Sequence, residues 1–259
     1  MGHSLIARLP KSARWRAITA LLQSPELSAP ELARLTTRAA NQRLVQLRGD
    51  PSLTYCVWLL TRLASASRSD DFVQSVGQLG IAVGRDDTAL QFIARVTDRA
   101  RVELNQFPES GPFGEMASLA LRHALVETVG TEGRSLLGSP LEDLERAFRR
   151  HSTATQFGEL SQRFFAAFMA RTLRFYVDRE LPHAVGGGGL ATIGASSDFT
   201  KALDLHAYQS ARIVEVFAAD WYSKKRFERL GAIGREDVEG FVAHALTKLR
   251  SELKREQLA

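Results

Sequence analysis

The spacing of apolar residues is helical along the whole chain, and no segment shows the alternation of apolar and polar residues that predicts a half-buried strand. Apolar side chains recur three and four positions apart, which places them on one side of an α-helix. The pattern predicts helices over about 12–23, 29–48, 51–66, 70–82, 87–106, 113–129, 140–150, 154–181, 199–220 and from about 234 into the C-terminal tail. We therefore expect an all-α, multi-helix bundle without a sheet.

Local signals mark several of the expected helix starts. Ser28, Pro30 and Glu31 have the order of an N-cap, a first-turn proline and a capping-box glutamate. The same order recurs over 139–142, where the residues are Ser-Pro-Leu-Glu. Asp198 is expected to cap the helix that follows it.

A glycine-containing stretch between 130 and 138 is the best candidate for a domain boundary. It predicts an N-terminal helical subdomain over 1–135 and a C-terminal one over 139–259, packed against each other. The most apolar expected helix, 154–181, is predicted to form the centre of the second subdomain because its polar strip is narrow.

A glycine-rich loop is predicted over 183–197, since Pro182 ends the preceding helix and four consecutive glycines follow at 186–189. A phosphate-binding P-loop would need a Lys-Ser/Thr pair after the glycines. The residues there are Leu190, Ala191 and Thr192, so we interpret the loop as a connector.

Composition restricts the class of protein. The chain has 259 residues, 44% of them hydrophobic and 24% charged, as in an ordinary folded protein. Its longest apolar run, 55–60, is far shorter than a membrane-spanning helix, and its N-terminus lacks the apolar segment of a secretory signal. Cys56 is the single cysteine, which excludes an internal disulfide. These features predict a cytoplasmic protein that does not bind membranes.

The formal net charge is +5, and basic residues outnumber acidic ones in the first 48 positions. The predicted basic face consists of Arg34, Arg38, Arg43 and Arg48. Such a face suits a nucleic-acid backbone, the acidic face of a protein partner, or simply solvent. The sequence leaves these three interpretations open.

No catalytic or metal-binding motif stands out. The histidines are scattered, and the Glu-x-x-His pair at 180 and 183 is a single copy interrupted by Pro182, so neither a metal nor another cofactor is expected. Arg146 and His151 have the spacing of an Arg-x4–6-His motif found in helical RNases, but in a chain this rich in arginine such a match is expected by chance.

A pocket is a minor hypothesis for the second half of the chain. His206 lies on an otherwise apolar helical stripe, and Gln209 and Arg212 lie near it on the same expected helix. Either the imidazole is buried and hydrogen-bonded, or the three side chains line a pocket. No small-molecule ligand is indicated by the sequence.

One segment interleaves aromatic and cationic residues. It contains Trp221, Tyr222, Lys224, Lys225 and Arg226, residue types that are common at protein interfaces and in nucleic-acid contacts. The same pattern also fits a helix end with buried rings and solvated charges. We take it as a candidate partner-binding surface.

Three phrases of the second half carry a resemblance. They are Arg163-Phe164-Phe165 followed by 176–182, then 205–214, then Trp221-Tyr222-Ser223-Lys224. Over roughly 155–250 the chain resembles uncharacterised helical accessory proteins of bacterial multi-gene cassettes such as anti-phage defence operons. The resemblance implies a component that works beside other proteins, and it implies no catalytic residues.

Three functions follow as hypotheses. The first is a non-enzymatic adaptor or assembly subunit of a bacterial multi-protein complex that binds another protein subunit. The second is a helical nucleic-acid-binding module that uses the basic N-terminal face together with Lys224 and Lys225. The third is a helical RNase.

Overall fold

The computed structural model describes residues 30, 31, 33, 36, 47–131, 139–177, 193–229 and 232–255. All regular elements among these residues are helical, which confirms an all-α multi-helix bundle. The elements are α3 (Pro51–Ala66), α4 (Phe72–Gly77), α5 (Ala89–Leu104), η1 (Pro108–Ser110), α6 (Pro112–Glu127), η2 (Val129–Thr131), α7 (Pro140–Arg150), α8 (Ala154–Val177), α10 (Ile193–Ser210), α11 (Arg212–Glu228) and α12 (Arg235–Arg255).

Short-range hydrogen bonds explain where several helices begin. The Asp50 carboxylate accepts from Leu53 N and caps α3. Thr88 begins α5 with a complete capping box, and Ser139 begins α7 with another. The box at Ser139 closes with Glu142, as the sequence over 139–142 predicts. Each box satisfies backbone N–H groups that would otherwise lack partners at the helix start.

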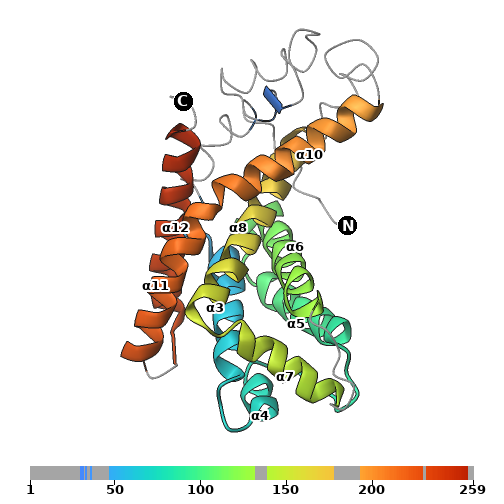
Figure 1. Ribbon diagram of the computed structural model, residues 1–259, viewed down its shortest axis with the longest axis vertical. Helices are drawn as coiled ribbons and strands as arrows, with labels where there is room; N and C mark the ends of the chain where they lie inside the picture. Colours follow the sequence, from blue (N-terminus) through green and yellow to red (C-terminus); the bar gives the residue numbers. More distant parts are fainter. Residues whose placement is uncertain are drawn as a thin grey trace.

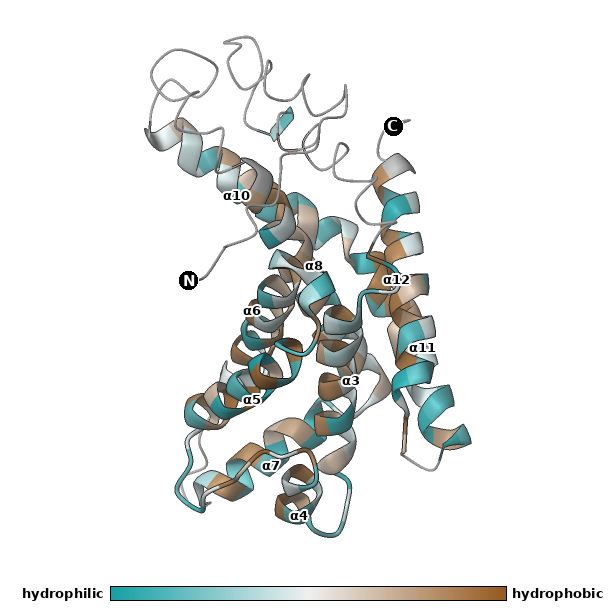
Figure 2. Cartoon of the chain, turned by 180° about the vertical axis from the view of Figure 1, so that it is seen from behind, coloured by the Kyte–Doolittle hydropathy of each residue, from teal (hydrophilic) through white to brown (hydrophobic). Residues whose placement is uncertain are grey.

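Helix α8 lies at the centre of the bundle, with α5 and α6 on one side of it and α11 and α12 on the other (Figure 1). It packs on α6, α10 and α11. Its buried side chains include Phe157, Leu160, Phe164, Phe165 and Phe168. Helices α5, α7 and α12 each carry an apolar and a polar side, as surface helices of a bundle do (Figure 2).

The helices after the glycines differ from the prediction. Residues 193–197, predicted as loop, belong to α10, so Asp198 lies within a helix and does not cap one. The single helix predicted over 199–220 is two helices, because the chain turns at Ala211 between α10 and α11. No proline or glycine marks this turn. It redirects the chain so that α11 runs along both α8 and α12.

The described residues on both sides of the predicted domain boundary contribute to one contiguous hydrophobic core. Within the boundary, 132–138 lie outside the described residues, as do 183–192 of the predicted glycine-rich loop. Cys56 is buried in this core, where burial raises the pKa of its thiol. None of the described helices combines the length and apolar character that crossing a bilayer requires.

Candidate binding sites

The first candidate site is a cavity of about 430 Å³ lined by arginine and serine side chains. Three arginines contribute to its wall: Arg62, Arg68 and Arg226. The other described lining residues are Ser65, Ala66, Ser69, Ser75 and Ala232, so no carboxylate is among them. Guanidinium and hydroxyl groups without a carboxylate in the described lining make a cavity suited to anions.

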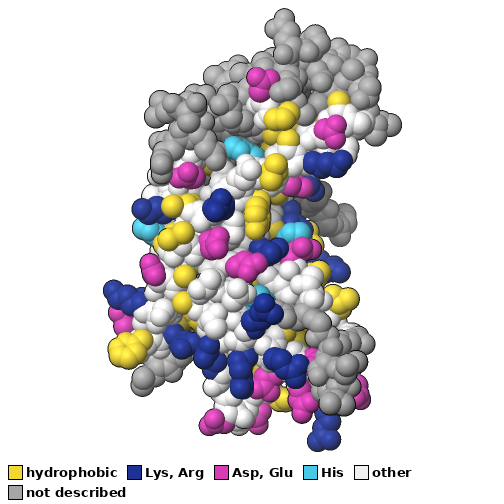
Figure 3. All heavy atoms as spheres, viewed as in Figure 1, with side chains coloured by type: hydrophobic (Ala, Val, Ile, Leu, Met, Phe, Trp, Pro, Cys, Tyr) yellow, Lys and Arg dark blue, Asp and Glu magenta, His cyan; other side chains and the backbone are white. Residues whose placement is uncertain are grey.

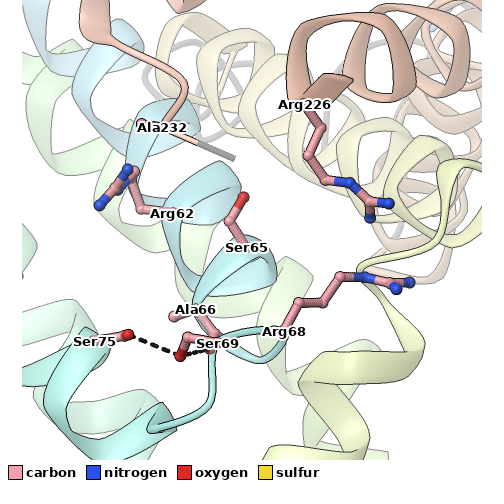
Figure 4. A pocket seen from close by; sticks show the side chains of 8 residues that line it. All are labelled: Arg62, Ser65, Ala66, Arg68, Ser69, Ser75, Arg226 and Ala232. Carbon is pink, nitrogen blue, oxygen red and sulfur yellow. Dashed lines mark hydrogen bonds between the residues drawn. The ribbon is translucent and has the colours of Figure 1, made fainter. Parts of the chain in front are cut away.

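The end of α3 shapes this cavity. Ser67 and Ser69 donate hydrogen bonds to Ala64 O at 2.8 Å and Ala66 O at 2.7 Å, which closes the last turn of the helix. Ser75 Oγ in α4 donates to Ser69 Oγ at 2.8 Å, so the two hydroxyl groups form one polar wall (Figure 4). Asp71 begins α4 nearby, and its carboxylate is engaged by Gln74 N at 2.8 Å.

Hydrogen bonds to Ser152 fix the positions of two of the arginines. Arg68 Nε donates to Ser152 Oγ at 2.6 Å, and Arg226 Nη1 donates to Ser152 O at 3.1 Å. Arg149 adds a bond from its Nε to Ser67 O at 3.0 Å, which joins the ends of α3 and α7. These contacts leave further N–H donors on each guanidinium for a ligand, because an arginine carries five.

Arg62 has a different environment. Its Nε atom is buried and has no hydrogen-bond partner among the described residues. Its side chain extends to one side of Ser65, whereas Arg68 and Arg226 extend to the other side (Figure 4). The cavity therefore presents two separated cationic positions with a hydroxyl group between them.

The surface around α7 carries charged side chains of both signs. Figure 3 shows a band of lysine and arginine side chains across the lower part of that face. Arg149 pairs with Glu145 at 2.6 Å, while Arg150 is exposed. Helix α7 also carries Glu142, Asp143 and Glu145, and Arg146 pairs with Asp143 at 2.7 Å, so acidic and basic side chains alternate on this surface.

A second cavity, of about 540 Å³, lies along α8 between α6 and α10. Arg163, Arg171 and Arg174 on α8 contribute to it, with alanines between them. Helix α6 supplies His123 and Glu127, and α10 supplies Asp204, Leu205 and Tyr208. We call this feature the α8 groove.

The charges of the α8 groove are partly paired. Asp204 forms an ion pair with Arg174. Burial raises the pKa of Asp204 and outweighs the opposing effect of Arg174. Burial also lowers the pKa of His123, with the nearby Arg171 acting in the same direction. The imidazole therefore favours its neutral form here.

The predicted partner-binding segment is divided by the structure. Tyr222 is buried and stacks on Phe157, and Trp221 stacks on Phe241 with ring centroids 4.3 Å apart. The Tyr222 ring therefore belongs to the core and is not available as a surface anchor, and the half-buried Trp221 ring packs against the core. The exposed aromatic ring of this segment is Phe227, which is 86% exposed.

The cations of that segment have different environments. Lys225 contacts Asp237 at 3.2 Å and Glu228 at 3.0 Å, and Lys224 lies 3.8 Å from Glu228. Arg226 lines the first cavity. Of the five residues predicted from sequence, Arg226 is thus the one that the structure brings to a cavity.

Of the four arginines of the predicted basic N-terminal face, the structure describes Arg48. Arg34, Arg38 and Arg43 lie outside the described residues. Arg48 is half-buried, and its Nε has no hydrogen-bond partner within the described part of the chain. Arg48 does not line either of the two cavities.

The other candidate residues lie apart from both cavities. His206 is half-buried in α10, Gln209 is exposed near its end, and Arg212 is exposed at the start of α11. The turn at Ala211 separates Arg212 from the other two. These three side chains therefore do not line the first cavity or the α8 groove.

Arg146 and His151, the pair with RNase-like spacing, do not form a site that is open to solvent. Arg146 is exposed and pairs with Asp143 at 2.7 Å, while His151 is 3% exposed. A substrate cannot reach this imidazole in the described conformation. The Glu-x-x-His pair at 180 and 183 lies outside the described residues, and within the described ones no group of three or more His, Cys, Asp or Glu side chains is placed to hold a metal ion.

Sequence reasoning missed Arg62, Arg68 and the serines of the first cavity. Arg62 and Ser65 are three residues apart, so they share one side of α3, but the rest of the helix pattern is that of a core helix. Their grouping with Arg226 depends on how α11 packs, which residue spacing does not show.

Comparison with known proteins gives no assignment. No family model, curated protein or solved structure matches the chain.

Proposed function

We propose that the protein is a non-enzymatic module that binds nucleic acid through the cavity formed by Arg62, Arg68 and Arg226. The single observation that carries this proposal is a cavity with three arginines, three serines and no carboxylate among its described lining residues. Phosphate groups suit such arginines, because a guanidinium can donate two parallel hydrogen bonds to one phosphate.

The arrangement of the arginines favours a strand over an isolated phosphate. Arg62 and the pair of Arg68 and Arg226 lie on opposite sides of Ser65 (Figure 4). We propose that these two cationic positions contact different phosphates of one backbone. Nucleic-acid binding is the second of the functions expected from sequence. The proposed contact residues are Arg62, Arg68 and Arg226 instead of the predicted N-terminal arginines.

The test is equilibrium binding of the full-length protein to a fluorescein-labelled single strand of about 20 nucleotides, as RNA and as DNA. Arg62→Gln is the principal variant, because Arg62 Nε has no hydrogen-bond partner among the described residues and the loss of the guanidinium should leave the fold intact. Arg122→Gln on α6 is the matched control, since it is exposed and lies outside both cavities.

We expect Arg62→Gln to weaken binding at least about fivefold, while Arg122→Gln leaves it unchanged. Thermal unfolding followed by circular dichroism checks that both variants fold. Equal affinities for the wild type and Arg62→Gln would contradict the proposal, as would no binding at low salt.

A second candidate function is the adaptor or assembly subunit. Exposed apolar side chains on α10 and α11 favour it: Leu205, Val216 and Phe227. The resemblance to helical accessory proteins of bacterial multi-gene cassettes, including anti-phage defence operons, supports the same function. Under this proposal the bound molecule is another protein subunit.

Its test is purification of the tagged full-length protein from its native cell with nuclease treatment. A stoichiometric co-purifying protein should be lost with Val216→Ser and Phe227→Ser. It should be retained with Val102→Ser, because Val102 on α5 is 61% exposed and Val216 is 68% exposed. Recovery of the protein without a stoichiometric companion would count against an assembly subunit.

A further inference from the structure

The α8 groove runs along one face of α8. Its floor follows α8 from Arg163 to Arg174 through residues spaced by three and four, which lie on one helix face. That stretch is about 16 Å long, or three helical turns. Ala166, Ala167 and Ala170 form its centre, and their small side chains allow another backbone to approach closely.

One wall of the groove exposes apolar surface. Leu205 on α10 is 57% exposed, and Tyr208, one turn further along, is also exposed. Both line the groove. These two side chains are open to solvent, whereas Ala166, Ala167 and Ala170 on the floor of the groove are buried.

One of the three arginines of the groove has no ion-pair partner among the described residues. Arg163 pairs with Glu159 at 2.7 Å and Arg174 pairs with Asp204, but Arg171 has no carboxylate within ion-pair distance among the described residues. Burial lowers the pKa of Arg171, and the neighbouring Arg174 acts in the same direction. A carboxylate brought to Arg171 would balance this charge.

Two buried polar atoms at the same place also lack partners within the described residues. They are Arg174 Nε and Asp204 Oδ1. Buried polar atoms in folded proteins are nearly always hydrogen-bonded, so a donor and an acceptor are missing here. The Arg174–Asp204 pair beside the groove therefore leaves hydrogen-bonding capacity unused.

We infer that the α8 groove docks one amphipathic helix of a partner protein, with apolar side chains over the alanine floor and Leu205, and with a carboxylate at Arg171. This inference rests on the second candidate function, protein docking, and is independent of the arginine–serine cavity. It names the docking surface and the chemistry of the partner segment.

The charge pattern favours an acidic amphipathic helix over a nucleic-acid strand. A strand would bring several phosphates next to the carboxylates of Glu127 and Asp204, which line the same groove. A helix can place one carboxylate at Arg171 and keep its apolar side on Leu205 and Tyr208. The polar side of such a helix stays in solvent.

The probe is a phage-displayed library of random peptides of about 14 residues, long enough for three helical turns, selected on the full-length protein. Individual enriched peptides are then measured by fluorescence anisotropy against the wild type, Leu205→Ser and Arg171→Glu. Leu90→Ser is the matched control, because Leu90 on α5 is 59% exposed and lies outside the groove.

We expect enriched peptides to carry apolar residues at spacings of three and four with an acidic residue beside them. Leu205→Ser and Arg171→Glu should each weaken binding at least about tenfold, and Leu90→Ser should not. Replacing the acidic residue of the peptide by lysine should restore binding to Arg171→Glu and abolish binding to the wild type.

Two results would overturn the inference in different ways. Enriched peptides that bind Leu205→Ser and Arg171→Glu as well as the wild type would reject the groove and leave protein docking at another surface in place. A selection without any enriched peptide would reject both the groove and the protein-docking function. Neither result bears on nucleic-acid binding at Arg62.

Discussion

The ring of Tyr222 stacks on the ring of Phe157 with their centroids 4.0 Å apart and their planes inclined by 16°. This contact joins α11 to the first turn of the central helix α8. The hydroxyl group of Tyr222 lies 3.4 Å from Ser65 Oγ on α3, beside the arginine–serine cavity. The pair therefore positions the helix that carries Arg226.

Tyr222→Ala should destabilise the protein by about 3–5 kcal/mol, because it removes a fully buried aromatic ring. Tyr222→Phe keeps the ring and should cost less than about 1 kcal/mol. Urea unfolding measures both values, with Phe227→Ala as the exposed control. A cost for Tyr222→Ala as small as that of Phe227→Ala would contradict the buried stacking.

Gly158 lies where the backbones of α8 and α11 approach each other closely. A Cβ atom at this position would lie 2.5 Å from the backbone oxygen of Glu215, which cannot move without shifting α11. Gly158→Ala should therefore destabilise the protein by about 1–3 kcal/mol.

The matched control for Gly158 is Gly240, which lies inside α12, where an added Cβ atom would meet nothing within 4 Å. Gly240→Ala should stabilise the protein by about 0.5–1 kcal/mol, because alanine favours the helix. The midpoint of thermal unfolding should shift in opposite directions for the two variants. Shifts in the same direction would contradict the packing of α8 on α11.

Glu103 connects α5 to the start of α12. It accepts hydrogen bonds from Arg235 Nη2 at 2.8 Å and from Arg99 Nη2 at 3.1 Å. Burial alone would raise the pKa of Glu103, but these bonds outweigh it and hold the pKa below the ordinary value of 4.5. Arg235 also lies over the rings of Tyr55 and Trp58.

A carboxylate with a lowered pKa in the folded state stabilises the protein above its unfolded pKa and loses that contribution as the pH falls through its folded pKa. Glu103→Gln should therefore cost on the order of 1 kcal/mol near pH 7. The difference from the wild type should vanish at acidic pH. Urea unfolding across this range is the measurement, and a difference that grows on acidification would contradict the prediction.

The sequence predicted most of the fold because helix boundaries are local. The helix expected over 51–66 is observed with those bounds, and the Ser139 capping box fixes the start of α7 as expected. Both signals depend on residues close together in the chain. The turn at Ala211 was missed because neither Ser210 nor Arg212 is a helix breaker and the turn depends on packing.

The candidate sites were less predictable because they depend on how distant helices pack together. Arg226 was selected from its neighbours Trp221 and Tyr222, yet those rings are used for the core. Arg62 and Arg226 are distant in sequence and line one cavity because α11 packs on α8 and its Tyr222 reaches Ser65 on α3. Only tertiary structure brings such residues together.

The central claim is that the cavity of Arg62, Arg68 and Arg226 binds the phosphates of a nucleic-acid strand. The most direct measurement is the affinity for the labelled single strand as a function of salt, for the wild type and for Arg62→Gln. Each phosphate neutralised should contribute about −0.7 to the slope of log K against log salt concentration. The account predicts a steep slope for the wild type that becomes shallower by about one such contribution in Arg62→Gln. Binding that is insensitive to salt, or a slope that Arg62→Gln leaves unchanged, would contradict it.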